Sequence, residues 1–125
     1  MIKRLPDAEF EIMKVIWRNN PPMTTIQIMD CLDSGKSWKP QTVLTMLIRL
    51  IEKGFLSSER VGRERNYMPI ITERDYMQIE TGDFVMRYRG NSVGSLVKAL
   101  YDGQNLSQED LCEMADWLKE KGGSV

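Results

Sequence analysis

Residues 40–56, PQTVLTMLIRLIEKGFL, predict an amphipathic helix that ends at a glycine and leads directly into a strand. Pro40 suits the first helical turn, where its missing amide hydrogen would have no partner, and Gly54 suits the C-terminal cap. At 100° per residue, three apolar side chains share one face and are expected in the core: Val43, Leu47 and Leu50. We therefore expect a helix over about residues 40–54 whose opposite face is polar.

The residues before this helix predict two others. Apolar residues recur at helical spacing after Pro6, and this first helix ends at residues 19–22, NNPP. Either Thr24 or Thr25 can act as the N-cap of a second, short helix, which ends at residues 33–36. We expect the second helix to bury three apolar side chains: Ile28, Met29 and Leu32.

After the third helix the sequence favours strands. Residues 55–60 and 66–71 predict two strands around the polar turn at residues 62–65. Pro69 has no amide donor, so the second strand must lie at a sheet edge or end early. Three helices followed by a hairpin is the order of a winged helix-turn-helix, in which residues 60–66 would be the wing.

The C-terminal part predicts three more helices. Thr72 can cap a long helix that reaches to about Tyr88, and a shorter helix covers residues 93–101. Ser107 and Asp110 have the spacing of a capping box, which opens a last helix. The chain is therefore expected to be mainly α with a small β-hairpin.

The charge is distributed unevenly along the chain. Overall, 17 Lys and Arg against 18 Asp and Glu give a net charge of −1, which does not by itself suggest a nucleic-acid partner. Residues 1–66 carry 11 basic against 8 acidic side chains, whereas residues 67–125 carry 6 against 10. A basic segment joined to an acidic one indicates two functions on one chain.

The composition also limits the chemistry. The absence of histidine excludes imidazole catalysis and His-ligated zinc, and we expect no catalytic residue, no metal and no cofactor. Cys31 and Cys112 fit no metal-binding spacing, so we expect two free, mostly buried thiols, with one distant disulfide as the alternative. Neither a secretory signal nor an apolar run of about 18 residues is found, which favours a cytoplasmic protein without membrane insertion.

The outer face of the third helix carries side chains suited to a major groove. It presents Gln41, Thr45, Ile48, Arg49 and Glu52, with Thr42 at its edge. A glutamine can pair with adenine, and a threonine methyl group can contact a thymine methyl group. An ordinary surface helix is the alternative, but the preceding helix and the basic hairpin favour DNA binding.

The hairpin and the approach to the third helix supply cations. Three arginines of the wing are expected to contact phosphates or to enter a minor groove: Arg60, Arg63 and Arg65. Glu59 and Glu64 reduce the local charge, and a solvated turn is the alternative. Lys36 and Lys39 fit phosphate anchoring, whereas Trp38 is expected to cap the core rather than to contact a sugar.

Residues 42–50, TVLTMLIRL, followed by EKGFL at residues 52–56, resemble the recognition helix and first wing strand of the penicillinase-repressor family, the BlaI/MecI/CopY repressors. Four further stretches agree in order along the chain: residues 9–17, 62–67, 95–100 and 106–111. The last two make the resemblance specific, because winged helices alone are widespread.

The resemblance implies a homodimeric transcriptional repressor whose winged helices read the two halves of a palindromic operator in double-stranded DNA. It places the base contacts at Gln41, Thr42, Leu44 and Thr45, with the cation of Arg49 further along the helix. The better-known β-lactam repressors are basic where this chain has Gln41 and Leu44. We therefore do not expect their operator sequence to apply here.

We divide the chain into a winged-helix DNA-binding domain, residues 1–71, and a helical dimerisation domain, residues 72–125. So short a helical region cannot bury all its apolar side chains without a second subunit, which predicts a dimer interface at Val93, Leu96, Val97, Leu100, Leu111, Met114 and Leu118. A closed monomeric core formed with the helix from Thr72 is the alternative. The fold class is a winged helix-turn-helix plus a C-terminal helical dimerisation region.

The signal that ends repression is not determined by the sequence. The resemblance implies a regulatory membrane sensor protease as partner, because repression in the β-lactam branch ends when an Asn–Phe bond is cut. The aligned pair here is Ala99-Leu100, which departs from that cleavage site. The copper-responsive branch carries paired CxC motifs, whereas Cys112 stands alone, so copper sensing through that motif is not expected.

An alternative function is a winged-helix protein-interaction module without sequence-specific DNA binding, which the net charge slightly favours. An enzyme is not expected, because the sequence has no Gly-rich phosphate loop and no paired carboxylates on a common face.

Overall fold

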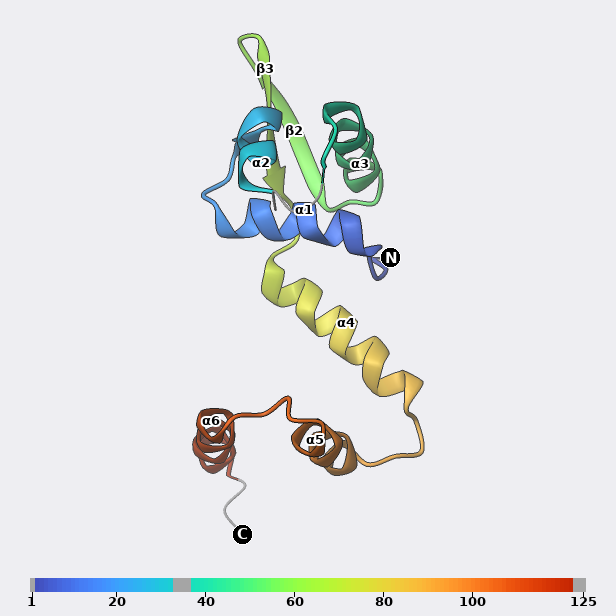
Figure 1. The fold of residues 1–125 in the computed structure, drawn as a ribbon, viewed down its shortest axis with the longest axis vertical. Coiled ribbons are helices and arrows are strands. Elements are labelled where there is room, and N and C mark those ends of the chain that lie inside the picture. Colours follow the sequence, from blue (N-terminus) through green and yellow to red (C-terminus); the bar gives the residue numbers. More distant parts are fainter. Residues whose placement is uncertain (1, 33–36, 123–125) are drawn as a thin grey trace. The chain divides into compact units, whose positions relative to one another are not determined.

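The computed structural model describes residues 2–32 and 37–122, which form helices and a small antiparallel sheet (Figure 1). The elements in chain order are α1 (Asp7–Arg18), β1 (Met23–Thr24), α2 (Thr25–Cys31), α3 (Pro40–Glu52), β2 (Leu56–Val61), β3 (Glu64–Pro69), α4 (Glu73–Arg87), α5 (Val93–Asp102) and α6 (Gln108–Glu120). The chain divides into two compact units, Met1–Asp83 and Phe84–Val125. The mainly helical class with a small hairpin is confirmed.

The predicted ends of α3 are confirmed. Pro40 is its first residue, and Gly54 adopts the left-handed conformation with φ of +86°. The amide of Gly54 donates to the carbonyl of Ile51, and the amide of Phe55 donates to the carbonyl of Leu50 at 2.9 Å. These two bonds form a Schellman motif, which a glycine favours and which turns the chain directly into β2.

The first unit contains one hydrophobic core to which its helices and strands contribute. The side chains that are 0% or 1% exposed are Ile12, Met13, Ile16, Ile28, Val43, Leu47, Leu50, Phe55, Leu56 and Tyr76. The three core positions predicted in α3 are thus confirmed. In α2, Ile28 and Leu32 are buried as predicted, whereas Met29 is only half-buried at the edge of the core.

The sheet has one strand more than predicted. Its order is β1-β3-β2, and all pairs are antiparallel. The extra strand, β1, pairs Met23 with Tyr67 and is too short to leave a pattern in the sequence. The expectation of an edge position for the strand containing Pro69 is wrong, because β3 is central; the other expectation, an early end, is correct, since β3 ends at Pro69.

The hairpin turn is tighter than the predicted stretch of residues 62–65. Val61 pairs with Glu64, so only Gly62 and Arg63 form the loop. Gly62 has a φ of +66° at the first loop position, where a type II′ turn takes glycine. The tight loop keeps the two strands paired to their tips, and the hairpin extends past the ends of α2 and α3 (Figure 1).

The caps follow the local sequence. Thr24, rather than Thr25, is the N-cap of α2, where it forms a capping box with Gln27. The hydroxyl oxygen of Thr72 accepts a hydrogen bond from the amide of Asp75 at 3.0 Å, as expected for the start of α4. The predicted end of the second helix at residues 33–36 lies outside the described residues.

An ion pair between the exposed Lys53 and the buried Glu9 connects the C-terminal end of α3 to α1. The carboxylate of Glu9, only 4% exposed, accepts a hydrogen bond from the ammonium group of Lys53 at 2.6 Å. In the sequence Glu9 is simply an acidic residue near a helix N-terminus, so its partner 44 residues away was not predicted. The pair fixes α3 at the point where the chain turns into the hairpin.

The first turns of α4 belong to the core of the first unit, because Tyr76 is 1% exposed. Its ring packs against Phe10, Trp17 and Phe55, with ring centroids 5.3 to 5.8 Å apart. Its hydroxyl oxygen accepts a hydrogen bond from the amide of Leu5 at 2.6 Å. Burial raises the pKa of Tyr76 to about 12, so the hydroxyl stays protonated at neutral pH.

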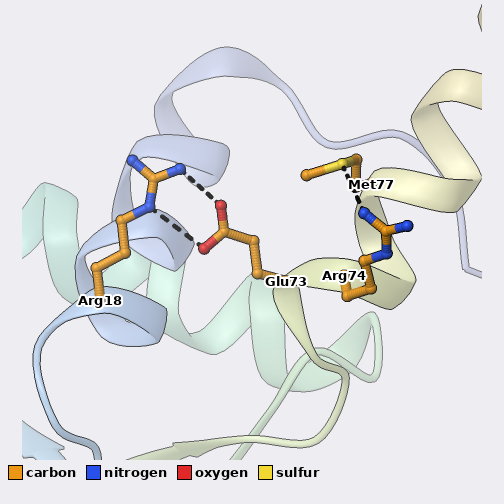
Figure 2. A network of polar contacts seen from close by, with 4 residues as sticks. All are labelled: Arg18, Glu73, Arg74 and Met77. Carbon is orange, nitrogen blue, oxygen red and sulfur yellow. Dashed lines mark hydrogen bonds and ion pairs between the residues drawn. The ribbon is translucent and has the colours of Figure 1, made fainter. Parts of the chain in front are cut away.

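An ion pair on the surface, with two hydrogen bonds, joins α1 to α4 (Figure 2). The guanidinium of Arg18 on α1 donates to the carboxylate of Glu73 on α4, from Nε at 3.2 Å and from Nη2 at 2.6 Å. The hydrogen bond from Arg18 holds the pKa of Glu73 below its usual range and raises that of Arg18. Arg74 turns the other way and approaches the sulfur of Met77 at 3.9 Å (Figure 2).

The described part of the second unit, residues 84–122, has helices but no buried core of its own. None of the described residues from 84 to 122 is buried. Among the seven apolar positions predicted at an interface, Val93, Leu100 and Leu118 are 61%, 42% and 48% exposed, and the others are half-buried. The predicted capping box of α6 is present: Ser107 accepts from the amide of Asp110, and that aspartate accepts from the amide of Ser107.

The expectation of buried cysteines is wrong. Both Cys31 and Cys112 are free and exposed. Cys31 is the last residue of α2, and Cys112 lies in the second unit, where no described side chain is buried. The average burial of cysteine in proteins misled the sequence interpretation, because burial at each position depends on the neighbouring elements that pack against it.

Removing the Tyr76 hydroxyl is expected to destabilise the first unit. Tyr76→Phe leaves the buried amide of Leu5 without an acceptor and should lower the free energy of unfolding by about 1–3 kcal/mol. Tyr76→Ala also leaves a cavity and should cost about 3–5 kcal/mol. Urea unfolding followed by circular dichroism measures both, with Tyr88→Phe, whose ring is exposed, as the control. Equal midpoints for Tyr76→Phe and the unchanged protein would contradict this role.

The Arg18–Glu73 pair is expected to make a pH-dependent contribution to stability. Because the hydrogen bond from Arg18 makes the pKa of Glu73 lower in the folded than in the unfolded state, the stabilisation is complete at neutral pH and is lost as the pH falls through the folded-state pKa of this carboxyl group. The midpoint temperature of thermal unfolding should therefore be lower for Glu73→Gln than for the unchanged protein at pH 7, and the two midpoints should converge at low pH. Arg18→Gln should lower the midpoint in the same way, and the variant with both substitutions should be no less stable than either single variant. Additive losses of stability in the double variant would exclude a direct interaction between the two side chains.

Candidate nucleic-acid interface

The outward face of α3 is fixed by the burial of its opposite face. With Val43, Leu47 and Leu50 fully buried, the side chains left toward solvent are those predicted from the helical period. The exposed or half-buried positions of this face are Gln41, Thr42, Leu44, Thr45, Ile48, Arg49 and Glu52. The structure therefore presents together, on one helix face, all the residues predicted to contact bases.

The N-terminal end of α3 is suited to a phosphate group. The first intrahelical bond runs from the amide of Val43 to the carbonyl of Lys39, which leaves the amides of Gln41 and Thr42 without an intrahelical partner. The positive end of the helix dipole and the exposed cation of Lys39 coincide there. Lys36, the other predicted anchor, lies outside the described residues.

Thr45 offers an acceptor and a methyl group rather than a donor. Its hydroxyl donates a hydrogen bond to the carbonyl of Gln41 at 2.9 Å, one turn earlier in α3. A hydroxyl engaged in this way can still accept a hydrogen bond from a base amino group, and its methyl group remains for apolar contact. This geometry favours the methyl contact considered from the sequence.

The two faces of the wing carry opposite charge. In the β2–β3 register Arg60 is directly opposite Arg65, and strand alternation puts both on the face where Tyr67 is buried. Glu59 and Glu64 occupy alternate positions and therefore lie on the other face of the sheet. The acidic residues that reduce the wing's charge in the sequence do not adjoin this arginine pair.

A pair of like charges directly opposite each other costs stability. Each guanidinium has one nearby acceptor: Arg65 donates to the hydroxyl of Ser58 at 2.9 Å, and Arg60 donates to the carbonyl of Gly62 at 3.4 Å. Neither acceptor is a carboxylate, so both cations keep their charge available for an external anion. Arg63, at the exposed tip of the hairpin, adds a third cation.

The start of α2 adjoins the wing, which the sequence did not predict. Thr25 and Ile26 line a hollow together with Arg63, Glu64 and Arg65. Ile26 is 66% exposed and therefore stands out from the helix surface. Only the three-dimensional arrangement brings this helix to the wing, since more than 35 residues separate the two segments.

Trp38, just before α3, packs against the core as the sequence favoured. Its indole nitrogen is covered and has no hydrogen-bond partner among the described residues. Within residues 2–32 and 37–122, no group of three or more Cys, Asp or Glu is placed to hold a metal ion. No helix in this part of the chain is long and apolar enough to span a membrane.

Comparisons with a family model and with known protein sequences match almost the whole chain to bacterial repressor and regulatory proteins. A family model described as penicillinase repressor matches residues 5–120. The penicillinase repressor of Bacillus licheniformis is 35% identical over 119 residues, which cover 95% of this chain and 92% of that protein. The methicillin resistance regulatory protein MecI of Staphylococcus aureus (strain N315) is 26% identical over 117 residues, 94% of each chain.

Solved structures resemble part of the chain. The solution structure of the DNA binding domain of the repressor BlaI has a TM-score of 0.53 and 42% identity, covering 61% of this chain and 92% of that one. The monomeric form of Bacillus licheniformis BlaI, in complex with the blaP half-operator, has a TM-score of 0.51 with the same identity and coverage. The second of these relatives binds DNA as a single chain on a half-site.

Proposed function

This chain belongs to the penicillinase repressor family, and we propose that it is a transcriptional repressor that binds a palindromic operator as a homodimer. The observation that carries the proposal is the outward face of α3, with its predicted base-contacting side chains beside a cationic wing face. A relative with 42% identity over the aligned part binds a half-operator, which supports the same use of this fold here.

Each part of the surface has a separate role in this proposal. Gln41, Thr42, Leu44 and Thr45 enter the major groove and contact base edges. The cations bind phosphates and supply affinity without regard to sequence: Lys39, Arg49, Arg60, Arg63 and Arg65. The first group sets which operator is bound, and the second sets how strongly binding depends on salt.

The dimer is supported by the second unit's lack of a buried core. Its helices α5 and α6 expose or half-expose the seven apolar positions of the predicted interface, and a second copy would cover them. A two-fold dimer places two α3 helices on successive major-groove turns, about 34 Å apart. Residues 1–71 then read DNA and residues 72–125 pair the subunits, with the first turns of α4 packed into the reading unit.

Release from DNA is proposed to need a partner. Ala99 and Leu100 lie within α5, whose N-terminus is capped by Ser92. A regulatory membrane sensor protease that cut there would first have to unfold a turn of this helix, because proteases bind extended chain. No catalytic role is proposed for this chain itself, and as a DNA-binding protein it would act in the cytoplasm.

Selection from random DNA duplexes with the full chain tests the proposal. We expect enrichment of a palindrome whose half-site centres are separated by one helical turn or a multiple of it, with two chains bound per duplex. Leu111→Asp should remove the coupling between the two half-sites, so that single chains occupy them independently and with lower affinity, whereas the control Glu109→Gln on the same helix should not. No enriched sequence, together with binding that is insensitive to salt, would favour the protein-interaction module instead.

The charge of the cationic wing face, which carries Arg60 and Arg65, is expected to affect how strongly DNA affinity depends on salt concentration. Arg60→Gln should lower the slope of log affinity against log salt by about 0.9 per subunit, on operator and random DNA alike, because one phosphate contact is lost. Glu59→Gln, one residue away on the opposite face, is the matched control and should leave the slope unchanged. A loss confined to operator DNA with an unchanged slope would contradict the phosphate role of Arg60.

A further inference from the structure

Ile48, on the outward face of α3, has no polar atom with which to bind a base. Ile48 is 57% exposed, and in α3, which the structure describes throughout, it is the one large apolar side chain exposed to this degree. It lies within about 20° of Gln41 around the helix axis, beside the polar side chains of the exposed face. Single exposed apolar residues are common on surfaces, so its position, rather than its exposure alone, is informative.

Ile48 continues an apolar strip that begins at Leu44. The two residues are four positions apart and about 40° apart around the helix, so they are neighbours on its surface. Leu44 is half-buried, and Ile48 extends the strip outward from it. The strip runs beside Thr45, whose hydroxyl is engaged with the backbone of α3. One side of the proposed base-contacting face is therefore apolar.

We propose that Ile48 specifies thymine at one position of each operator half-site by contact with the thymine 5-methyl group. This inference rests on the proposed function, since it requires α3 to enter a major groove. The floor of that groove presents hydrogen-bonding groups at every base pair, and its apolar projection is the thymine methyl group. An isoleucine placed against any other base edge would remove a polar group from water without replacing its hydrogen bond.

The size of the effect follows from the area of one methyl group. Burial of one such group stabilises a contact by about 0.8 kcal/mol, which corresponds to about fourfold in affinity per half-site. A palindrome bound through both half-sites should then lose about fifteenfold when both methyl groups are removed. Replacement of thymine by deoxyuridine removes only this methyl group and leaves base pairing and the hydrogen-bonding edge unchanged.

The experiment measures affinity of the full chain for its selected palindrome and for duplexes in which single thymines of each half-site are replaced by deoxyuridine. At one thymine position, we expect replacement by deoxyuridine to reduce the affinity of the unchanged protein about fourfold per half-site. The same replacement should not change the affinity of Ile48→Ala. Ile70→Ala is the matched control, an isoleucine 62% exposed beyond the end of β3, and it should keep the full sensitivity. Circular dichroism confirms that each variant is folded.

Two results would overturn the inference and are distinguishable. If a palindrome is selected but every deoxyuridine duplex affects the unchanged protein and Ile48→Ala equally, Ile48 does not read a thymine methyl group, and the proposed function stands. If no sequence is selected at all, the proposed function fails and the inference fails with it.

Discussion

The orientation of α3 about its own axis is the constraint on which the rest of the first unit depends. Val43, Leu47 and Leu50 are fully buried, and each such burial stabilises the fold by about 1.5–3 kcal/mol. Rotating the helix by about half a turn would expose this face and bury Gln41 and Arg49 instead. The Schellman motif at Gly54 and the Glu9–Lys53 ion pair fix the far end of the helix. The outward face is thus determined by the core, not by the ligand.

The wing depends on the same core through the sheet. Leu56 and Tyr67 are buried on one face of the hairpin, and strand alternation then commits Arg60 and Arg65 to that face further out. Repulsion between these two arginines, which lie directly opposite each other, destabilises the free protein, and a bound phosphate would neutralise that repulsion. The first unit accordingly presents the proposed base-contacting and phosphate-binding groups at positions that both follow from buried apolar residues.

The features that the sequence predicted correctly are local ones. Helix phase, the glycine cap at Gly54, the threonine cap at Thr72 and the Ser107 capping box each depend on residues within one or two turns. The hairpin was predicted for the same reason. The division into residues 1–71 and 72–125, the base and phosphate contacts and the dimer interface stay predictions.

The features that the sequence did not predict depend on distant partners or on register. Tyr76 bonds to Leu5 across 71 residues, so nothing near residue 76 indicates that α4 starts inside the core. The β1 strand exists only as a partner of β3. The position of Arg60 directly opposite Arg65 required the strand register. The exposure of both cysteines depends on how neighbouring elements pack, which the local sequence does not give.

The most direct test of the account follows the backbone amide resonances of the full chain while its selected operator is added. Because DNA contact is assigned to the outward face of α3 and to the wing arginines, the largest changes should fall at Lys39, Gln41, Thr42, Leu44, Thr45, Ile48, Arg49, Arg60, Arg63 and Arg65. The buried side of α3 and the outer wing face around Ser57 and Met68 should change little. Largest changes at the outer wing face, or along α1 away from α3, would contradict the central claim.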